Sequence, residues 1–183
     1  MLTFSIAAAT AAIGYALWLR MKTMALPKGS GEMLEIAEAI RQGSKAYLKR
    51  QNTTVFWVAI GVGFIIWMSP LGFKTALGFI LGAATSAAAG YLGMMTAVQA
   101  NVRTAEAAKK DLAKAFSAAF SGGAVTGFLV AGLALLAVSV FYALTGEIGP
   151  LVGLAFCSSL ISVFARLGGG IYTKAADVGA DLV

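Results

Sequence analysis

The sequence predicts an all-α integral membrane protein. Of its 183 residues, 59% are hydrophobic and only 12% are charged, whereas soluble domains carry about 25% charged residues. The charges also stand in groups between long charge-free runs, as bilayer-spanning helices require. These numbers argue against a soluble globule and exclude a disordered chain. The absence of histidine and the single cysteine exclude histidine-based catalysis, an internal disulfide and a cysteine-cluster metal site.

Five charge-free runs are each long enough for one membrane-spanning helix, since a bilayer core requires about 20 apolar residues per helix. The first run has no basic segment before it, so an uncleaved anchor is favoured over a signal peptide. Turn-forming residues follow the second run (69–72) and the fourth run (145–150). The predicted spans are roughly 2–20, 53–69, 75–98, 116–145 and 151–172.

The distribution of basic residues predicts the orientation. The segments that follow the first and third spans carry almost all of the Lys and Arg residues, whereas the opposite turns carry only Lys74. Basic loops stay in the cytoplasm, so segments 21–52 and 99–115 are predicted to be cytoplasmic and the N-terminus to lie outside. The net charge of +6 is therefore interpreted as a topology signal, and no nucleic-acid partner is expected.

Two features suggest helices that extend beyond the bilayer. As a helix, residues 115–146 would measure roughly 48 Å, which exceeds a hydrocarbon core of about 30 Å. Tilt or extension into the cytoplasm would explain this length. In the first cytoplasmic segment, a turn at 26–31 precedes apolar residues at helical spacing. This pattern predicts an amphipathic helix that lies on the membrane or against neighbouring helices.

The C-terminal residues 166–183 carry four charges. At about 100° per residue, Arg166, Lys174, Asp177 and Asp181 fall within one narrow arc of a helix. Two carboxylates one turn apart suit Mg²⁺, and a lysine suits phosphate oxygens. The alternative is a solvated helix end in which Lys174 pairs with Asp177. Arg166, near bilayer depth, either requires an acidic partner on another helix or extends its side chain to the interface.

Residues 168–183, GGGIYTKAADVGADLV, resemble the signature of membrane-integral inorganic pyrophosphatases, the H⁺ or Na⁺ pumps driven by pyrophosphate. Weaker support comes from 43–48 (GSKAYL) and 100–104 (ANVRT). The resemblance implies a bundle of about sixteen transmembrane helices, usually a homodimer, in the cytoplasmic membrane. It places the pyrophosphate site at the cytoplasmic ends of an inner ring of helices that includes the fifth span.

The resemblance also implies roles for individual residues. Lys174 would contact pyrophosphate, Asp177 and Asp181 would hold Mg²⁺, and Arg166 would lie in an ionic cluster that couples hydrolysis to ion movement. K⁺ is a further candidate cofactor. Because the family motif continues beyond Val183, we expect the chain to be an N-terminal portion of the enzyme that is inactive alone.

Two non-enzymatic alternatives remain at this point. The first is a small five-span transporter or channel subunit, and the second is a purely structural helical bundle. Either would explain the topology, but neither gives a reason for Lys174, Asp177 and Asp181 on one cytoplasmic helix face. The sequence does not distinguish H⁺ from Na⁺ as the transported ion.

Overall fold

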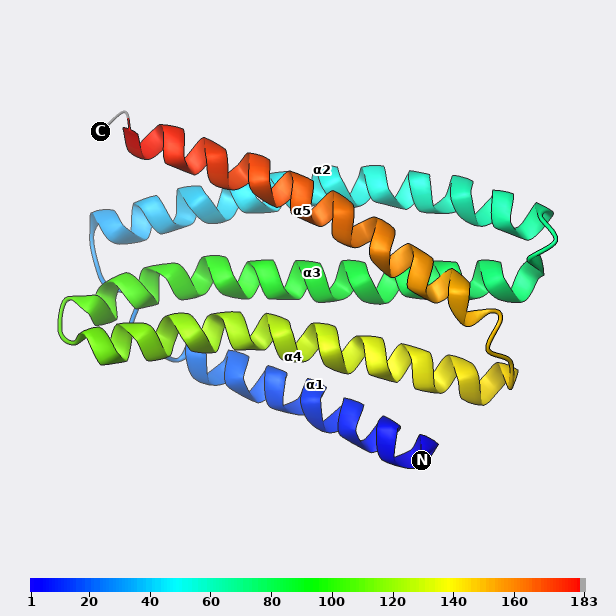
Figure 1. The fold of residues 1–183 in the computed structure, drawn as a ribbon. Coiled ribbons are helices and arrows are strands. Elements are labelled where there is room, and N and C mark those ends of the chain that lie inside the picture. Colours follow the sequence, from blue (N-terminus) through cyan, green and yellow to red (C-terminus); the bar gives the residue numbers. More distant parts are fainter. Residues whose placement is uncertain (182–183) are drawn as a thin grey trace.

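The computed structural model describes residues 1–181, except the side chains of residues 164, 166–168, 171–172, 175–176 and 180. The described residues form long helices that run antiparallel in chain order, with α3 at the centre of the bundle (Figure 1). One side of α3 is covered by α4 and then α1, and the other side by α2 and α5. The helices are α1 (Leu2–Met24), α2 (Glu32–Met68), α3 (Gly72–Ala108), α4 (Leu112–Thr145) and α5 (Leu151–Asp181).

Each connection has a local chemical cause. Gly146 adopts φ 66° in the left-handed region and ends α4, where its N–H donates to the Tyr142 carbonyl at 2.9 Å. Asp111 caps the start of α4 by accepting a hydrogen bond of 2.8 Å from the Ala113 N–H. At the opposite end of the bundle, Lys74 pairs with Glu147 at 2.5 Å and joins the α2–α3 end to the α4–α5 connection.

The helices are longer than the predicted spans. Helices α2 and α3 each contain 37 residues and α4 contains 34, so each is roughly 50 Å long. The sequence predicts an amphipathic helix after the 26–31 turn and a separate second span, but in the structure these two parts form one continuous helix, α2. The reason is that residues 49–54 contain neither Gly nor Pro, so nothing ends the helix between the two parts.

Four helices, α1 to α4, are long and apolar enough to cross a membrane by length and composition. In α5 the apolar segment found among the described residues is Leu151–Val163. The fifth predicted span, 151–172, includes residues with undescribed side chains and stays a prediction. The helical architecture confirms the predicted class of an all-α membrane bundle.

Glycines allow α3 to approach its neighbours closely. A β-carbon added at Gly82 would lie 2.5 Å from the Leu154 carbonyl oxygen of α5, and one at Gly78 would lie 2.8 Å from the Pro150 carbonyl oxygen. Both distances are far below van der Waals contact, so only glycine fits. Small residues serve this purpose in membrane bundles. Gly90 differs, because a β-carbon there would meet nothing within 4 Å.

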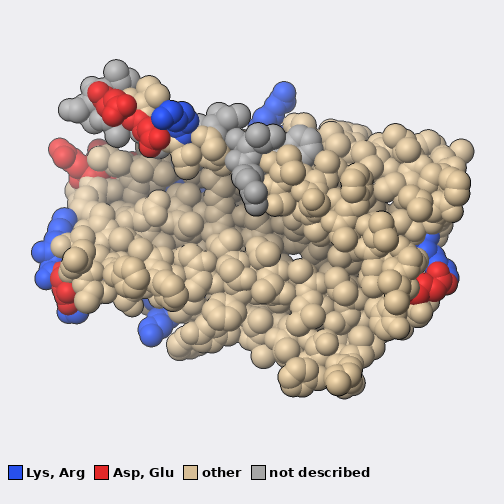
Figure 2. Space-filling view, viewed as in Figure 1, with Lys and Arg blue, Asp and Glu red and all other residues tan. Residues whose placement is uncertain are grey.

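Charged side chains gather at one end of the bundle. Figure 2 shows most of the Lys, Arg, Asp and Glu residues on the left, where the α1–α2 and α3–α4 connections and the end of α5 lie. A small charged group, which includes Lys74 and Glu147, marks the other end. The positive-inside rule predicts that the strongly charged end faces the cytoplasm, and Lys174, Asp177 and Asp181 of α5 lie at that end.

Candidate functional site

The last turns of α5 present three of the four predicted site residues to solvent. Lys174, Asp177 and Asp181 are all exposed. The Lys174 Nζ lies 3.7 Å from Asp177 Oδ2, and Asp181 follows one helical turn later. The structure therefore contains the i,i+3 pair that the spacing allowed, and it leaves both carboxylates accessible.

The Lys174–Asp177 ion pair is exposed to solvent and therefore weak. The two side chains are 78% and 66% exposed, and an ion pair in that setting contributes about 0–1 kcal/mol. Such a pair separates at little cost when a ligand offers either partner a stronger interaction. Lys174 can therefore turn to an anion while Asp177 turns to a cation.

Arg166 lies in α5, but its side chain is outside the described residues. Eight residues separate it from Lys174, which places it roughly 12 Å further along the helix, toward the apolar segment. Helix α5 continues through the glycines at 168–170 without a break. At Gly169 and Gly170 an added β-carbon would meet nothing within 4 Å, so neither glycine is required there by a close contact at its Cβ position.

The acidic residues of α5 fit a metal only as a partial ligand set. Among the described residues, no group of three or more His, Cys, Asp or Glu side chains is positioned to hold a metal ion. Mg²⁺ usually binds one or two protein carboxylates and takes its remaining oxygen ligands from phosphate and water. Asp177 and Asp181 match that requirement if phosphate oxygens complete the coordination.

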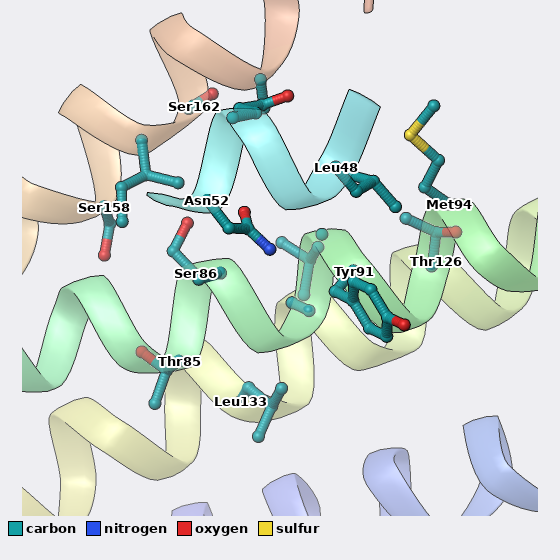
Figure 3. Close-up of a pocket in the computed structure, with 18 of the residues that line it drawn as sticks. Leu48, Asn52, Thr85, Ser86, Tyr91, Met94, Thr126, Leu133, Ser158 and Ser162 are labelled. Atoms are coloured by element: carbon teal, nitrogen blue, oxygen red, sulfur yellow. The ribbon is translucent and has the colours of Figure 1, made fainter. Parts of the chain in front are cut away.

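A groove of about 490 Å³ runs beside the middle of α5, and the sequence did not predict it. Figure 3 shows Ser158 and Ser162 of α5 across the groove from Thr85 and Ser86 of α3, with Asn52 of α2 between them. The Ser158 hydroxyl donates to the Leu154 carbonyl at 2.9 Å, and the Thr85 hydroxyl donates to the Leu81 carbonyl at 2.9 Å. The hydroxyl groups of Ser158 and Thr85 are therefore satisfied within their own helices.

Arg103 is a second feature that sequence reasoning missed. The sequence predicts Arg103 only as one of the basic residues of a cytoplasmic segment that sets the topology, but in the structure its exposure is only 3%. A signal was present in the sequence: buried Ala89, Gly93, Thr96 and Ala100 follow one face of α3, and Arg103 continues that spacing. A residue in register with a packed helix face is expected to be buried too.

The comparison with known families decides the identity of the chain. The family model described as "Inorganic H+ pyrophosphatase" matches residues 10–183. The chain belongs to the inorganic H⁺ pyrophosphatase family. Membership confirms the resemblance inferred from residues 168–183 and gives a family context for the charged end of α5.

Curated relatives of this chain are named as pumps. It is 56% identical over 156 residues to the "K(+)-insensitive pyrophosphate-energized proton pump" of Methanosarcina mazei, covering 85% of this chain and 23% of that protein. It is 46% identical to the "K(+)-insensitive pyrophosphate-energized proton pump 2" of Moorella thermoacetica, over 92% of this chain and 26% of that protein. It is 44% identical to the "Putative K(+)-stimulated pyrophosphate-energized sodium pump" of Clostridium tetani, over 100% of this chain and 27% of that protein. The chain thus spans about a quarter of the length of these relatives.

Proposed function

We propose that the whole protein hydrolyses inorganic pyrophosphate and uses the released energy to move H⁺ or Na⁺ across the cytoplasmic membrane. This chain contributes a part of the substrate site. Membership of the inorganic H⁺ pyrophosphatase family carries the proposal, and the exposed charged face of α5 at the cytoplasmic end supports it. The alternative of a non-enzymatic transporter subunit offers no role for that face.

Lys174 is the proposed pyrophosphate contact. Its ammonium is a compact charge with three donors, which suits phosphate oxygens. Its Nζ lies 3.7 Å from Asp177 Oδ2, so it is positioned beside the proposed cation ligand. Binding of a phosphate oxygen to Lys174 therefore exchanges one weak, solvated ion pair for a stronger charge-assisted hydrogen bond.

Asp177 and Asp181 are the proposed Mg²⁺ ligands. When bound, Mg²⁺ supplies charge neutralisation at the phosphate oxygens. The two carboxylates, one turn apart on one exposed face, would hold the ion at the helix surface and fix the register of the substrate along α5. Arg166, about two turns deeper, is proposed to couple hydrolysis to ion movement. We also propose that the enzyme is a homodimer, as the family resemblance implies.

Carboxylate replacement in the full-length protein tests this assignment. Asp177→Ala and Asp181→Ala are each expected to abolish both pyrophosphate hydrolysis and ion uptake by membrane vesicles. Glu147→Ala is the matched control, because it removes an exposed carboxylate at the opposite end of the bundle, and it should retain both activities. Near-normal hydrolysis in either aspartate variant would remove that residue from the site.

The relatives favour H⁺ as the transported ion. A relative named a proton pump is 56% identical to this chain, whereas relatives named as proton pumps and as sodium pumps both occur between 37% and 46% identity. We therefore propose proton pumping without a K⁺ requirement. Vesicles should acidify on addition of pyrophosphate in Na⁺-free buffer, with the same rate in K⁺ and in choline. Uptake of ²²Na⁺, or strong stimulation by K⁺, would assign the protein to the sodium-pumping type.

A further inference from the structure

A basic pocket lies at the cytoplasmic end of the bundle, apart from the charged face of α5. It has a volume of about 330 Å³ and is formed by the end of α1, the following loop, the end of α3 and the start of α4. Its lining includes one carboxylate, Glu106, which pairs with Lys109 at 2.8 Å. The positive charge is in excess, since the lining contains four cationic residues: Lys22, Arg103, Lys110 and Lys114.

Arg103 shows that this pocket is more than a cluster of surface lysines. The residue is 97% buried, since its exposure is 3%. Its Nη1 donates to the Gln99 carbonyl at 2.6 Å and its Nη2 donates to the Met24 carbonyl at 2.9 Å. Its buried Nε has no hydrogen-bond partner, and among the described residues no carboxylate forms an ion pair with it. A buried cation without an ion-pair partner is costly, and an anion in the pocket would lower that cost.

The position of the pocket indicates what kind of anion fits. It lies where the charge-free run of α1 ends and that of α4 begins. Just below, Trp18 is half exposed and the Lys22 ammonium lies 5.4 Å from its ring centre. On α4, the stacked rings of Phe116 and Phe120 are 70% and 68% exposed. Exposed aromatic residues at this depth are typical of the membrane interface.

The pocket also continues toward the apolar part of the bundle. Ser117 and Ser121, one turn apart on α4, belong to its lining together with Thr23 of α1. Below them α1 and α4 pack against each other, where Gly132 admits Ile13. Beside this contact both helices keep exposed apolar side chains, such as Met21 of α1 and Phe120 of α4, so an anionic group held by the cations would stand next to apolar helix surface. A free anion would leave that surface unused, whereas a lipid would cover it with its acyl chains.

We propose that this pocket binds the phosphodiester headgroup of an anionic phospholipid from the cytoplasmic leaflet. Arg103 and the three lysines contact the phosphate, and the acyl chains lie along the exposed faces of α1 and α4. Basic pockets between transmembrane helices on the cytoplasmic side are suited to anionic headgroups. The bound lipid would tie the end of α1 to the α3–α4 connection. This inference does not depend on the proposed pump activity.

Lipid titration of the full-length protein, purified in a mild detergent and followed by native mass spectrometry, tests the proposal. The probes are phosphatidylglycerol, phosphatidylcholine as the zwitterionic comparison, and inorganic phosphate as the free anion. The wild-type protein should bind phosphatidylglycerol more tightly than phosphatidylcholine. Each basic residue near the membrane surface contributes a similar free energy to the binding of an anionic lipid. Removing two of them, in the double variant Lys110→Gln with Lys114→Gln, should therefore weaken phosphatidylglycerol binding about thirtyfold.

The control is Lys45→Gln with Lys49→Gln, which makes the same charge change one turn apart on α2, where both lysines are exposed. This control should bind phosphatidylglycerol as the wild-type protein does. Arg103→Lys, which keeps the charge but removes the planar fork, should weaken binding less than the double variant. Equal weakening in the control, or equal binding of both lipids, would overturn the proposal. Lysine-dependent binding of inorganic phosphate that displaces the lipid would also overturn it.

Discussion

The Thr75 carbonyl of α3 lies directly against Gly153 of α5, where a β-carbon on residue 153 would overlap the carbonyl oxygen. This contact, the contact of Gly82 with Leu154, and the contact of Gly78 with Pro150 just before α5 hold the backbone of α3 against the start of α5. They fix the direction in which α5 leaves the α4–α5 connection. The charged turns at the far end of α5 are positioned by this packing.

Gly153→Ala is expected to destabilise the protein, because the added methyl group has no space unless α5 moves away from α3. Overpacking of this kind costs about 1–3 kcal/mol. The measurement is the thermal unfolding midpoint of the full-length protein in detergent. Gly127→Ala in α4 is the matched control, since a β-carbon there meets nothing within 4 Å and alanine favours the helix by about 0.5–1 kcal/mol. A midpoint for Gly153→Ala equal to that of the control would refute the close contact.

The helices were predictable from the sequence because two signals agree. The charge-free runs locate the apolar part of each helix, and Gly, Pro and Asp residues such as Gly146 and Asp111 mark the ends. Helix length was less predictable, because hydrophobicity marks the part that crosses the bilayer and not the part that is helical. Residues 49–54 show this difference, since they are polar and yet continue α2.

The part of the candidate site that was predictable is the part whose residues lie close together in the sequence, on one helix. Spacing alone placed Lys174 and Asp177 on one helix face, and the structure shows them 3.7 Å apart. The basic pocket was not predictable, because Lys22 at the end of α1 and Lys110 in the α3–α4 connection are far apart in the sequence, and their proximity depends on tertiary packing. Arg103 was missed for a related reason: a charged residue near a predicted loop is usually exposed, and only its register with Ala100 and Thr96 indicated burial.

Lys174 provides a prediction that separates substrate binding from fold maintenance. Lys174→Ala should raise the KM for pyrophosphate at least about tenfold, because one charge-assisted contact to phosphate contributes roughly 1.5–3 kcal/mol. Stability should not change, since the side chain is 78% exposed. Steady-state hydrolysis and thermal unfolding of the same preparation provide both measurements. Lys174→Arg should recover part of the loss, and an unchanged KM in Lys174→Ala would leave this residue as part of a solvated helix end.

Arg166 provides a test of coupling. Because it lies roughly 12 Å along α5 from Lys174, Arg166→Ala is expected to disturb ion transport more than pyrophosphate binding. The ratio of ions moved to pyrophosphate hydrolysed should fall, with little change in KM. Parallel assays of hydrolysis and vesicle acidification measure this ratio. If the ratio and both rates match those of the wild-type protein, Arg166 extends to the membrane interface and has no role in coupling.

Arg103→Met should loosen the end of α1 without greatly changing global stability. Two effects oppose each other: the variant loses the hydrogen bonds to Met24 and Gln99, but it also removes a buried charge that lacks an acidic partner among the described residues. Replacing buried charges by apolar groups is often neutral or stabilising. The local effect is not compensated, because the hydrogen bond of 2.9 Å from Arg103 Nη2 joins α3 to the Met24 carbonyl at the end of α1.

Hydrogen exchange in residues 21–31 of Arg103→Met should therefore accelerate while the unfolding midpoint stays close to the wild-type value. Arg50→Met, at an exposed position of α2, should leave that exchange unchanged, and equal protection of residues 21–31 in Arg103→Met would show that Arg103 does not hold α1 in place.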